Sequence, residues 1–204
     1  MIAILSYGLG NIKAFANIYR NLNVPHIIAD HPAALKEASK IILPGVGAFD
    51  HAMQRLKASG LAEPLAEQVL GRGVPVLGIC VGMQMLADSS EEGSEPGLGW
   101  VPGTVRKIRI EPTSRIRLLP HMGWNTVVPR DGDPLLAGLD AAQGFYFLHS
   151  YHFCPQDEGD AIARADYASE FVCAVRRGHI AGVQFHPEKS HHNGVRLLQN
   201  FAEA

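Results

Sequence analysis

The sequence contains few cysteines, no long apolar run and no block of basic residues. Its three cysteines, Cys80, Cys154 and Cys173, cannot all pair and match no zinc-binding spacing, which excludes a disulfide-stapled secreted scaffold. No run approaches the roughly 18 apolar residues of a membrane span. The N-terminus also lacks the basic leader and small-residue cleavage site of a signal peptide. We therefore expect a cytoplasmic protein with no membrane partner.

The charge balance argues against nucleic acid as a partner. The chain of 204 residues carries 18 Lys and Arg against 20 Asp and Glu, for a formal net charge of −2. A nucleic-acid-binding surface needs a concentrated positive charge, which is missing here. Apolar residues make up 47% of the chain, which is typical of a globular protein and excludes disorder.

Short apolar runs bounded by glycine or proline predict buried strands. These runs cover residues 2–5, 26–29, 41–43, 74–79, 145–148, 172–175 and 180–185. Helical spacing of apolar residues predicts helices over residues 12–22, with Asn11 as the cap, over 49–56 and over about 192–201. A charge-rich stretch, residues 89–99, resembles a linker.

The order of these elements predicts the fold class. Strands and helices alternate through residues 1–88, which favours right-handed βαβ units and a parallel sheet. Between residues 104 and 185 strands follow one another with little helix between them, so we expect an antiparallel extension of the sheet. No composition shift divides the chain. We therefore expect one α/β domain over residues 1–204, with a mixed, mostly parallel central sheet flanked by helices.

A nucleophile is predicted where the fourth strand ends. Residues 78–82 read Gly-Ile-Cys-Val-Gly between an apolar strand and a helical segment. This is the pattern of a nucleophile elbow, in which a strained turn leaves room only for glycine two residues either side of the nucleophile. Cys80 at the start of a helix is also placed to favour the thiolate. Cys154 and Cys173 lie in apolar segments and are expected to be packing residues.

A base and its orienting group are predicted near the end of the last strand. Residues 182–188 read Gly-Val-Gln-Phe-His-Pro-Glu, so His186 is followed two residues later by Glu188. In an extended segment these two side chains point to the same side, and Glu188 can accept a hydrogen bond from one ring nitrogen while the other faces Cys80. Pro187 stiffens the spacer. A Cys-His-Glu triad results.

A glycine-rich turn after the third strand is a candidate for oxyanion stabilisation. Residues 44–47 read Pro-Gly-Val-Gly, and loops at the carboxyl ends of parallel strands are where open α/β sheets place their sites. The backbone amides of Gly47 and Val81 can converge near Cys80 and donate to a developing negative charge.

Several segments together resemble the triad class of glutamine amidotransferases. They are Pro-Gly-Val-Gly at 44–47, Gly-Ile-Cys-Val-Gly-Met-Gln at 78–84 and His-Pro-Glu-Lys-Ser at 186–190. Further segments resemble the glutaminase subunits of imidazole glycerol phosphate synthases within that class. These are Tyr-Gly-Leu-Gly-Asn at 7–11, Pro-His-Met-Gly-Trp-Asn at 120–125 and Phe-Tyr-Phe-Leu-His-Ser-Tyr at 145–151. The resemblance covers essentially the whole chain and implies a flavodoxin-like sheet.

The resemblance implies a reaction and its residues. Cys80 would attack the side-chain amide of L-glutamine, and His186, held by Glu188, would move the protons through a glutamyl thioester to glutamate and ammonia. Matching positions imply that Gln84, Ser150 and Tyr151 hold the glutamine. No metal or cofactor is implied.

The resemblance also implies a partner. Such subunits form a heterodimer with a (β/α)₈ barrel cyclase, which uses the ammonia to make imidazole glycerol phosphate and an aminoimidazole carboxamide ribotide in histidine biosynthesis. Asn11, Trp124 and Lys189 match positions near the partner; core packing is the alternative for Trp124. A chain of 204 residues leaves no room for a barrel of about 250 residues.

The same residues argue against several other functions. Gly8-Leu9-Gly10 follows a strand, but Lys13 stands where a dinucleotide-binding fingerprint has its third glycine. His149 with His152, or His191 with His192, lacks a third metal ligand. In other cysteine hydrolases the acid usually lies elsewhere in the chain, so the two-residue spacing of His186 and Glu188 argues against that class. An inactive binding module would lack a triad member, whereas all three are present. The main alternative is a glutaminase subunit serving pyridoxal phosphate or anthranilate synthesis.

Overall fold

The computed structural model describes residues 1–110, 118–130, 132–140 and 142–204. Its first part alternates strands and helices, as predicted. The elements are β1 (Ile2–Leu5), α1 (Ile12–Asn21), β2 (His26–Ala29), α2 (Pro32–Leu35), β3 (Lys40–Gly45), α3 (Phe49–Ala58), α4 (Ala62–Ala66), the π-helix η1 (Glu67–Gly71), β4 (Val76–Cys80) and α5 (Val81–Gln84).

The second part is mostly strands. They are β5 (Ser89–Ser90), β6 (Gly103–Lys107), β7 (His121–Asn125), β8 (Val128–Pro129), β9 (Phe145–His149), β10 (Tyr151–Pro155), β11 (Ala161–Tyr167), β12 (Ser169–Arg177) and β13 (Ile180–Val183). Two 3-10 helices lie between strands of the described part, η2 (Pro134–Leu136) and η3 (Glu158–Asp160). A further one, η4 (Pro187–Lys189), follows β13 and leads into α6 (His191–Glu203).

Five parallel strands form the half of the sheet that carries the nucleophile segment. Their order is β2-β1-β3-β4-β13, the order of a flavodoxin-like sheet. All four strand pairs are parallel. The carboxyl ends of β3, β4 and β13 therefore meet at one edge, and Gly45 is the Cα partner of Cys80.

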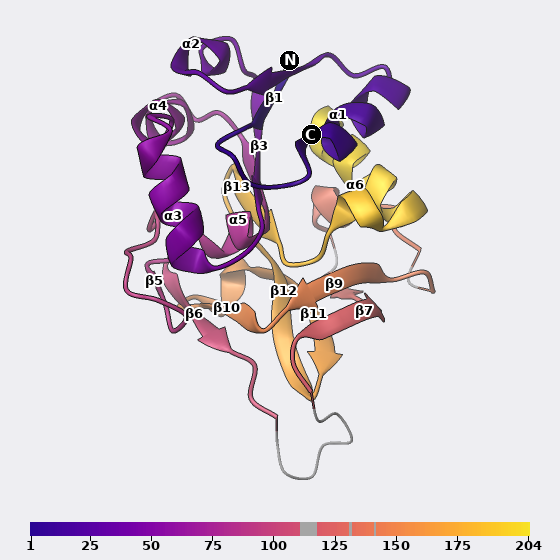
Figure 1. The fold of residues 1–204 in the computed structure, drawn as a ribbon. Coiled ribbons are helices and arrows are strands. Elements are labelled where there is room, and N and C mark those ends of the chain that lie inside the picture. The colour runs from indigo at the N-terminus through magenta and orange to yellow at the C-terminus, as the bar shows by residue number, and fades with distance from the viewer. Residues whose placement is uncertain (111–117, 131, 141) are drawn as a thin grey trace.

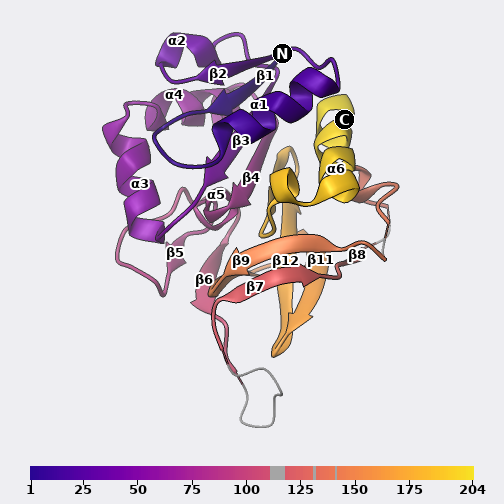
Figure 2. The ribbon, with the colours of Figure 1, turned by 45° about the vertical axis from the view of Figure 1, so that its right-hand side comes forward.

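Beyond β13 the sheet continues antiparallel through β12, β10 and β6, as expected, and β11 pairs with β12. A separate two-stranded ribbon is formed by β7 and β9, in which Met122 is opposite Leu148 and Trp124 is opposite Tyr146. Figure 2 shows this ribbon crossing in front of β12 and β11. The α/β class with a mixed sheet is thus confirmed.

Helices cover both faces of the parallel strands. In Figure 1, α1 and α6 lie on one side, and α2, α3 and α4 lie on the other. The strands between them are buried on both faces, which explains their continuous apolar sequences: every residue of β1 and of β4 is buried. Among the described residues no helix has both the length and the apolar character needed to cross a membrane.

Three local expectations are corrected. The last parallel strand ends at Val183 rather than at residue 185. Asn11 precedes α1, but its side chain makes no capping hydrogen bond. The stretch 89–99 is no linker, because both carboxylate oxygens of Asp50 on α3 accept hydrogen bonds from the backbone amides of Ser94 and Glu95, at 2.9 and 3.0 Å.

Candidate active site

Cys80 is the last residue of β4 and turns the chain sharply into α5. Its φ of 55° lies in the left-handed region that few non-glycine residues adopt, as expected of a nucleophile elbow. A Cβ on Gly82 would lie 1.9 Å from the backbone oxygen of Leu43, and one on Gly78 would lie 2.6 Å from the oxygen of Gly82. Both glycines are therefore required by close backbone packing.

The helix behind Cys80 is shorter than the sequence suggests. The helical segment expected after residues 78–82 is a single turn, because α5 ends at Gln84. A single turn aligns few peptide dipoles, so its effect on the Cys80 sulfur is weaker than that of a long helix. The main charged partner of the sulfur is instead His186, which lies beside it.

His186 and Glu188 form a buried pair. Nδ1 of His186 lies 3.0 Å from Oε1 of Glu188, and the two side chains are 4% and 2% exposed. The expected extended spacer is wrong, since Pro187 begins the 3-10 turn η4. The turn still directs Glu188 back to the ring. His186 is anchored by its backbone amide, which donates to the oxygen of Tyr146 at 2.9 Å.

The environment of His186 favours its protonated form. Burial by itself would lower its pKa, but hydrogen bonds to Cys80 and Glu188, together with the negative charges of these two partners, raise the pKa from 6.5 to about 10. At neutral pH the ring is therefore an imidazolium, with Nδ1 donating to Glu188. It holds a proton next to the Cys80 sulfur.

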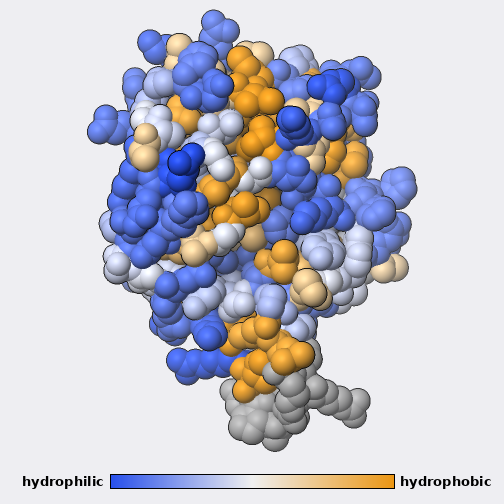
Figure 3. Space-filling model, in the orientation of Figure 1, coloured by the Kyte–Doolittle hydropathy of each residue, from blue (hydrophilic) through white to orange (hydrophobic). Residues whose placement is uncertain are grey.

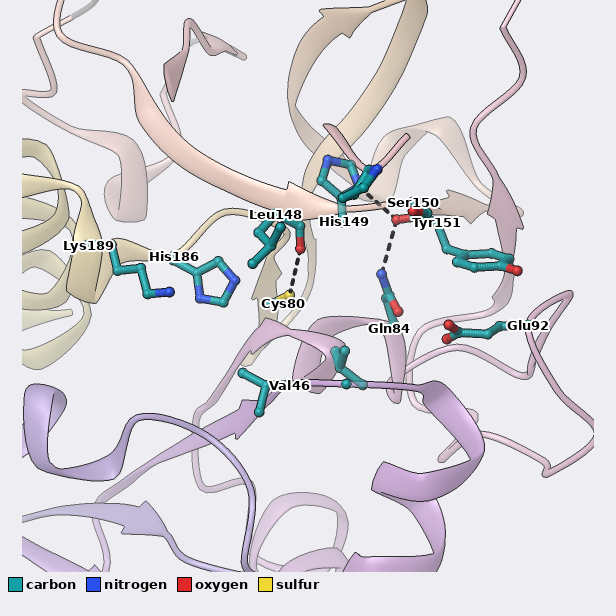
Figure 4. Close-up of a pocket in the computed structure, with 13 residues that line it drawn as sticks. Val46, Cys80, Gln84, Glu92, Leu148, His149, Ser150, Tyr151, His186 and Lys189 are labelled. Carbon is teal, nitrogen blue, oxygen red and sulfur yellow. Dashed lines mark hydrogen bonds between the residues drawn. The ribbon is translucent and has the colours of Figure 1, made fainter. Parts of the chain in front are cut away.

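A cavity of about 350 Å³ opens above Cys80 (Figure 4). The residues that line the cavity are far apart in the sequence, and most of them were predicted to be site residues. These are Gly47, Cys80, Val81, Gln84, Ser150, Tyr151, His186 and Lys189. Glu188 lies behind His186 and does not line the cavity. The volume suits a small molecule such as an amino acid.

The glycine-rich turn after β3 forms part of the cavity wall. Gly47 has a φ of 90°, and no atom lies within 4 Å of the position that a Cβ would take. The space beside this turn is therefore open. Val46 and Gly47 line the same cavity as Cys80 and Val81. The two turns therefore both border the cavity into which the sulfur opens.

Gln84 is oriented by the strand that follows the ribbon. Its Nε2 donates to the backbone oxygen of Tyr151 at 3.1 Å and to Oε1 of Gln184 at 3.0 Å. Both amide hydrogens are therefore used within the protein. Its Oε1 stays available as an acceptor beside the cavity.

Glu92, Leu148 and His149 also line the cavity, although no sequence pattern predicted them as site residues. Glu92 comes from the stretch that resembled a linker, and its carboxylate accepts from the backbone amide of Phe49 at 2.8 Å. It places a negative charge on the wall across from Lys189 (Figure 4). Only its position within a charge-rich segment could have drawn attention to it.

Two of the three predicted partner-facing residues, Lys189 and Trp124, lie against the same side chain, Tyr146. Lys189 lines the cavity, with its ammonium 5.6 Å from the centre of the Tyr146 ring. Trp124 is 50% exposed, so core packing is the wrong alternative for it. Asn11 is exposed and lines a separate hollow with Ser6 and Gly10.

The remaining cysteines and histidines have other surroundings. Cys173 is fully buried, which raises its pKa, and Cys154 is half-buried with a raised pKa from the same cause. Packing roles fit both. Among the described residues, no group of three or more His, Cys, Asp or Glu side chains is placed to hold a metal ion.

Known proteins similar to this chain are found in one family. The family model for glutamine amidotransferase class-I matches residues 3–204. The chain is 56% identical over 203 residues to the imidazole glycerol phosphate synthase subunit HisH of Bdellovibrio bacteriovorus, covering 100% of both chains. It is 50% identical to the subunit of the same name from Leptospira interrogans, covering 99% of both.

The fold has solved counterparts. A crystal structure of a glutamine amidotransferase matches 100% of this chain and 99% of its own, with a TM-score of 0.71 at 17% identity. The fold likeness, the family match and the similarity over the whole chain agree. The chain belongs to the class-I glutamine amidotransferase family, within the group of HisH subunits of imidazole glycerol phosphate synthase.

Proposed function

We propose that this chain is the glutaminase subunit of an imidazole glycerol phosphate synthase, acting as one cytoplasmic domain over residues 1–204 without metal or cofactor. The observation that carries the proposal is the placement of Cys80 and His186 on the floor of one cavity, with Glu188 bonded to the far side of the ring. This is the arrangement of a nucleophile, a base and an orienting group.

The first half of the reaction makes a thioester. The Cys80 sulfur attacks the side-chain amide carbon of L-glutamine, and the carbonyl oxygen becomes an oxyanion. The backbone amides of Gly47 and Val81 are the proposed donors to this oxyanion, since both border the space next to the sulfur. His186 gives its proton to the amide nitrogen, the carbon–nitrogen bond breaks, and ammonia leaves.

The second half releases glutamate. Neutral His186 now takes a proton from a water molecule, whose oxygen attacks the thioester carbon. The carbon–sulfur bond breaks, glutamate leaves, and the sulfur and His186 return to the starting ion pair. Glu188 keeps the ring oriented and stabilises its positive charge in both halves.

The cavity also offers groups that recognise the free amino acid. Glu92 supplies a negative charge that suits the α-ammonium of glutamine. Gln84 presents its carbonyl oxygen, which accepts from an amide or ammonium group but not from a carboxylate. We propose that Ser150 and Tyr151 complete the wall around the substrate.

The exposed face of the β7–β9 ribbon is the proposed docking surface for the (β/α)₈ barrel cyclase. Met122, Trp124 and Leu148 are 66%, 50% and 38% exposed, and Leu148 also lines the cavity. An apolar, aromatic surface of this kind is typical of an interface centre. Figure 3 shows apolar side chains in a band through the middle of this view, with hydrophilic side chains on both sides. A partner seated there would receive ammonia before water protonates it.

The proposal is tested with Cys80→Ala in the complex with the barrel cyclase. We expect glutamine-dependent formation of imidazole glycerol phosphate to be abolished, while formation from added ammonium salt continues at the parent rate. Loss of both activities would contradict the division of labour. The isolated chain is expected to hydrolyse glutamine poorly and to be activated by the ligand-bound partner; full turnover by the chain alone would argue against that coupling.

The same assay separates the alternative. A glutaminase subunit for pyridoxal phosphate or anthranilate synthesis would not support imidazole glycerol phosphate formation with any barrel cyclase. The names of the relatives at 56% and 50% identity favour the first function.

A further inference from the structure

Gln184 is a buried polar residue that the reaction described above does not use. It follows β13, and its backbone amide donates to the oxygen of Cys173 at 2.8 Å. Its side chain has no solvent exposure and lies between the nucleophile and the glutamine pocket. Nε2 is 3.7 Å from the Cys80 sulfur, and Oε1 is 3.0 Å from Nε2 of Gln84. A polar side chain buried so completely needs each of these partners.

The direction of this hydrogen-bond chain is fixed by the backbone. The carbonyl oxygen of Tyr151 can only accept, so Gln84 must turn its Nε2 toward it. The second hydrogen on that nitrogen then requires an acceptor, which is Oε1 of Gln184. As a result Gln184 can present only its N–H end to Cys80. A backbone carbonyl on β10 thus determines that the sulfur receives a donor.

A donor aimed at sulfur favours the thiolate over the thiol. Hydrogen bonds to charged groups are stronger than those to neutral ones, and they hold the group in one position. We propose that Gln184 is a positioning residue that stabilises the Cys80 thiolate and couples it to Gln84, so that the nucleophile and the substrate pocket are set by one chain of amides. The role of Gln184 in the reaction rests on the proposed function. The experiment that tests its hydrogen bond to Cys80 does not.

Other titratable groups around the sulfur come from several elements. His186 and Lys189 lie beyond β13, His149 is on β9, and Glu92 lies across the cavity. Tyr7 lies after β1, close enough for the negative charge on Cys80 to add to the effect of burial in raising the pKa of Tyr7. The test therefore changes Gln184 alone and leaves these groups in place.

The experiment measures alkylation of Cys80 by iodoacetamide between pH 5 and 10 in the full chain, with the modified peptide quantified by mass spectrometry. Gln184→Met keeps the length of the side chain and removes the donor. We expect the midpoint of the alkylation profile to move to higher pH by about one unit, the shift that corresponds to losing one charge-assisted hydrogen bond. Gln184→Glu, which keeps the volume, is expected to move it further, because a carboxylate then faces the sulfur.

Gln68 provides the matched control, since it is a glutamine 4% exposed whose Oε1 accepts from Arg72 at 3.0 Å, at the opposite end of β4. Gln68→Met should leave the Cys80 profile at the parent midpoint. A Gln184→Met profile that coincides with the parent overturns the proposal. If Gln184→Met does not fold, Gln184→Leu, which also lacks a donor, takes its place in the same comparison. Alkylation needs neither glutamine nor a partner, so the shift in the Cys80 profile can be interpreted even if the proposed function is wrong.

Discussion

Nδ1 of His121 lies 3.0 Å from Nε2 of His149 inside the molecule, and both residues are buried. Nδ1 of His149 faces the backbone oxygen of Tyr151 at 2.8 Å, and a carbonyl only accepts, so this nitrogen carries the hydrogen. Nε2 of His149 is then the acceptor, and His121 donates to it. Nε2 of His121 in turn accepts from Nδ2 of Asn125 at 3.3 Å, so these hydrogen bonds are complete only when both rings are neutral.

This pair predicts a loss of stability in acid. Burial lowers the pKa of His149 to about 3 and that of His121 to about 4. Because both values lie below the unfolded value of 6.5, the contribution is full above pH 6.5 and is lost as the pH falls toward 4 and 3. We expect His149→Gln, which retains a donor to Tyr151, to be less sensitive to acid than the parent.

The measurement is urea unfolding of the parent and His149→Gln at pH 7 and pH 5. The difference between their unfolding free energies should change by about 2 kcal/mol in favour of the variant at pH 5. His179→Gln is the control, since Nε2 of His179 donates to the backbone oxygen of Val69 at 2.8 Å, away from the His121–His149 pair. Parallel pH profiles for the parent and His149→Gln would contradict the prediction.

Glu188→Gln removes the charge that supports the His186 imidazolium. We expect the pKa of His186 to fall from about 10, and glutamine hydrolysis by the complex to drop by about 10²- to 10⁴-fold. Since the raised pKa lies above 6.5, the stabilisation from this pair is full below pH 6.5 and is lost as the pH rises through 10.

An NMR titration of His186 and the turnover rate of the complex check this prediction. Glu170→Gln is a control, because Glu170 is an exposed carboxylate bonded to Arg164 on β11. The orienting role of Glu188 is refuted if the His186 titration and the turnover of Glu188→Gln both match the parent.

Gly82→Ala is expected to destabilise the elbow strongly. Its Cβ would lie 1.9 Å from the backbone oxygen of Leu43, and neither backbone segment can move away without disturbing β3 or β4. We expect a loss of about 3 kcal/mol in unfolding free energy, measured in urea. Gly71→Ala is the matched control, because the nearest atom to its Cβ is Cγ of Glu67 at 3.8 Å. Equal stabilities of the two variants would show that the close packing is not required.

Trp124→Ala tests the docking surface. The side chain is half exposed and contacts the rings of Tyr146 and His191, so its removal should change the unfolding free energy by less than about 1 kcal/mol. The Kd for the barrel cyclase, measured by titration calorimetry, should rise at least about tenfold. Leu70→Ala is the control, since Leu70 is 58% exposed on η1, at the opposite end of the sheet. An unchanged Kd for Trp124→Ala would remove Trp124 from the interface.

The sequence by itself determined the parallel part of the fold and the identity of the nucleophile segment. Strands buried on both faces must be apolar throughout, so β1, β3 and β4 were visible as short runs. The glycines at 78 and 82 were informative because a strand or helix gains nothing from them unless the backbone is crowded. The spacing of His186 and Glu188 also predicted their contact correctly, although through the wrong local geometry.

Only the tertiary structure decided which groups surround the sulfur. Glu92 reaches the site from a segment whose local sequence carries no catalytic pattern. His149 and Gln184 lie in segments with recognisable motifs, but nothing in those motifs indicates that these two side chains contact the site, because side-chain proximity across strands leaves no periodic signal. The length of α5 and the turn at Pro187 depended on packing that local propensity does not encode. The direction of the hydrogen bonds from Tyr151 to Cys80 likewise depends on which backbone carbonyl lies next to Gln84, and that is settled only when the antiparallel strands fold against the parallel ones.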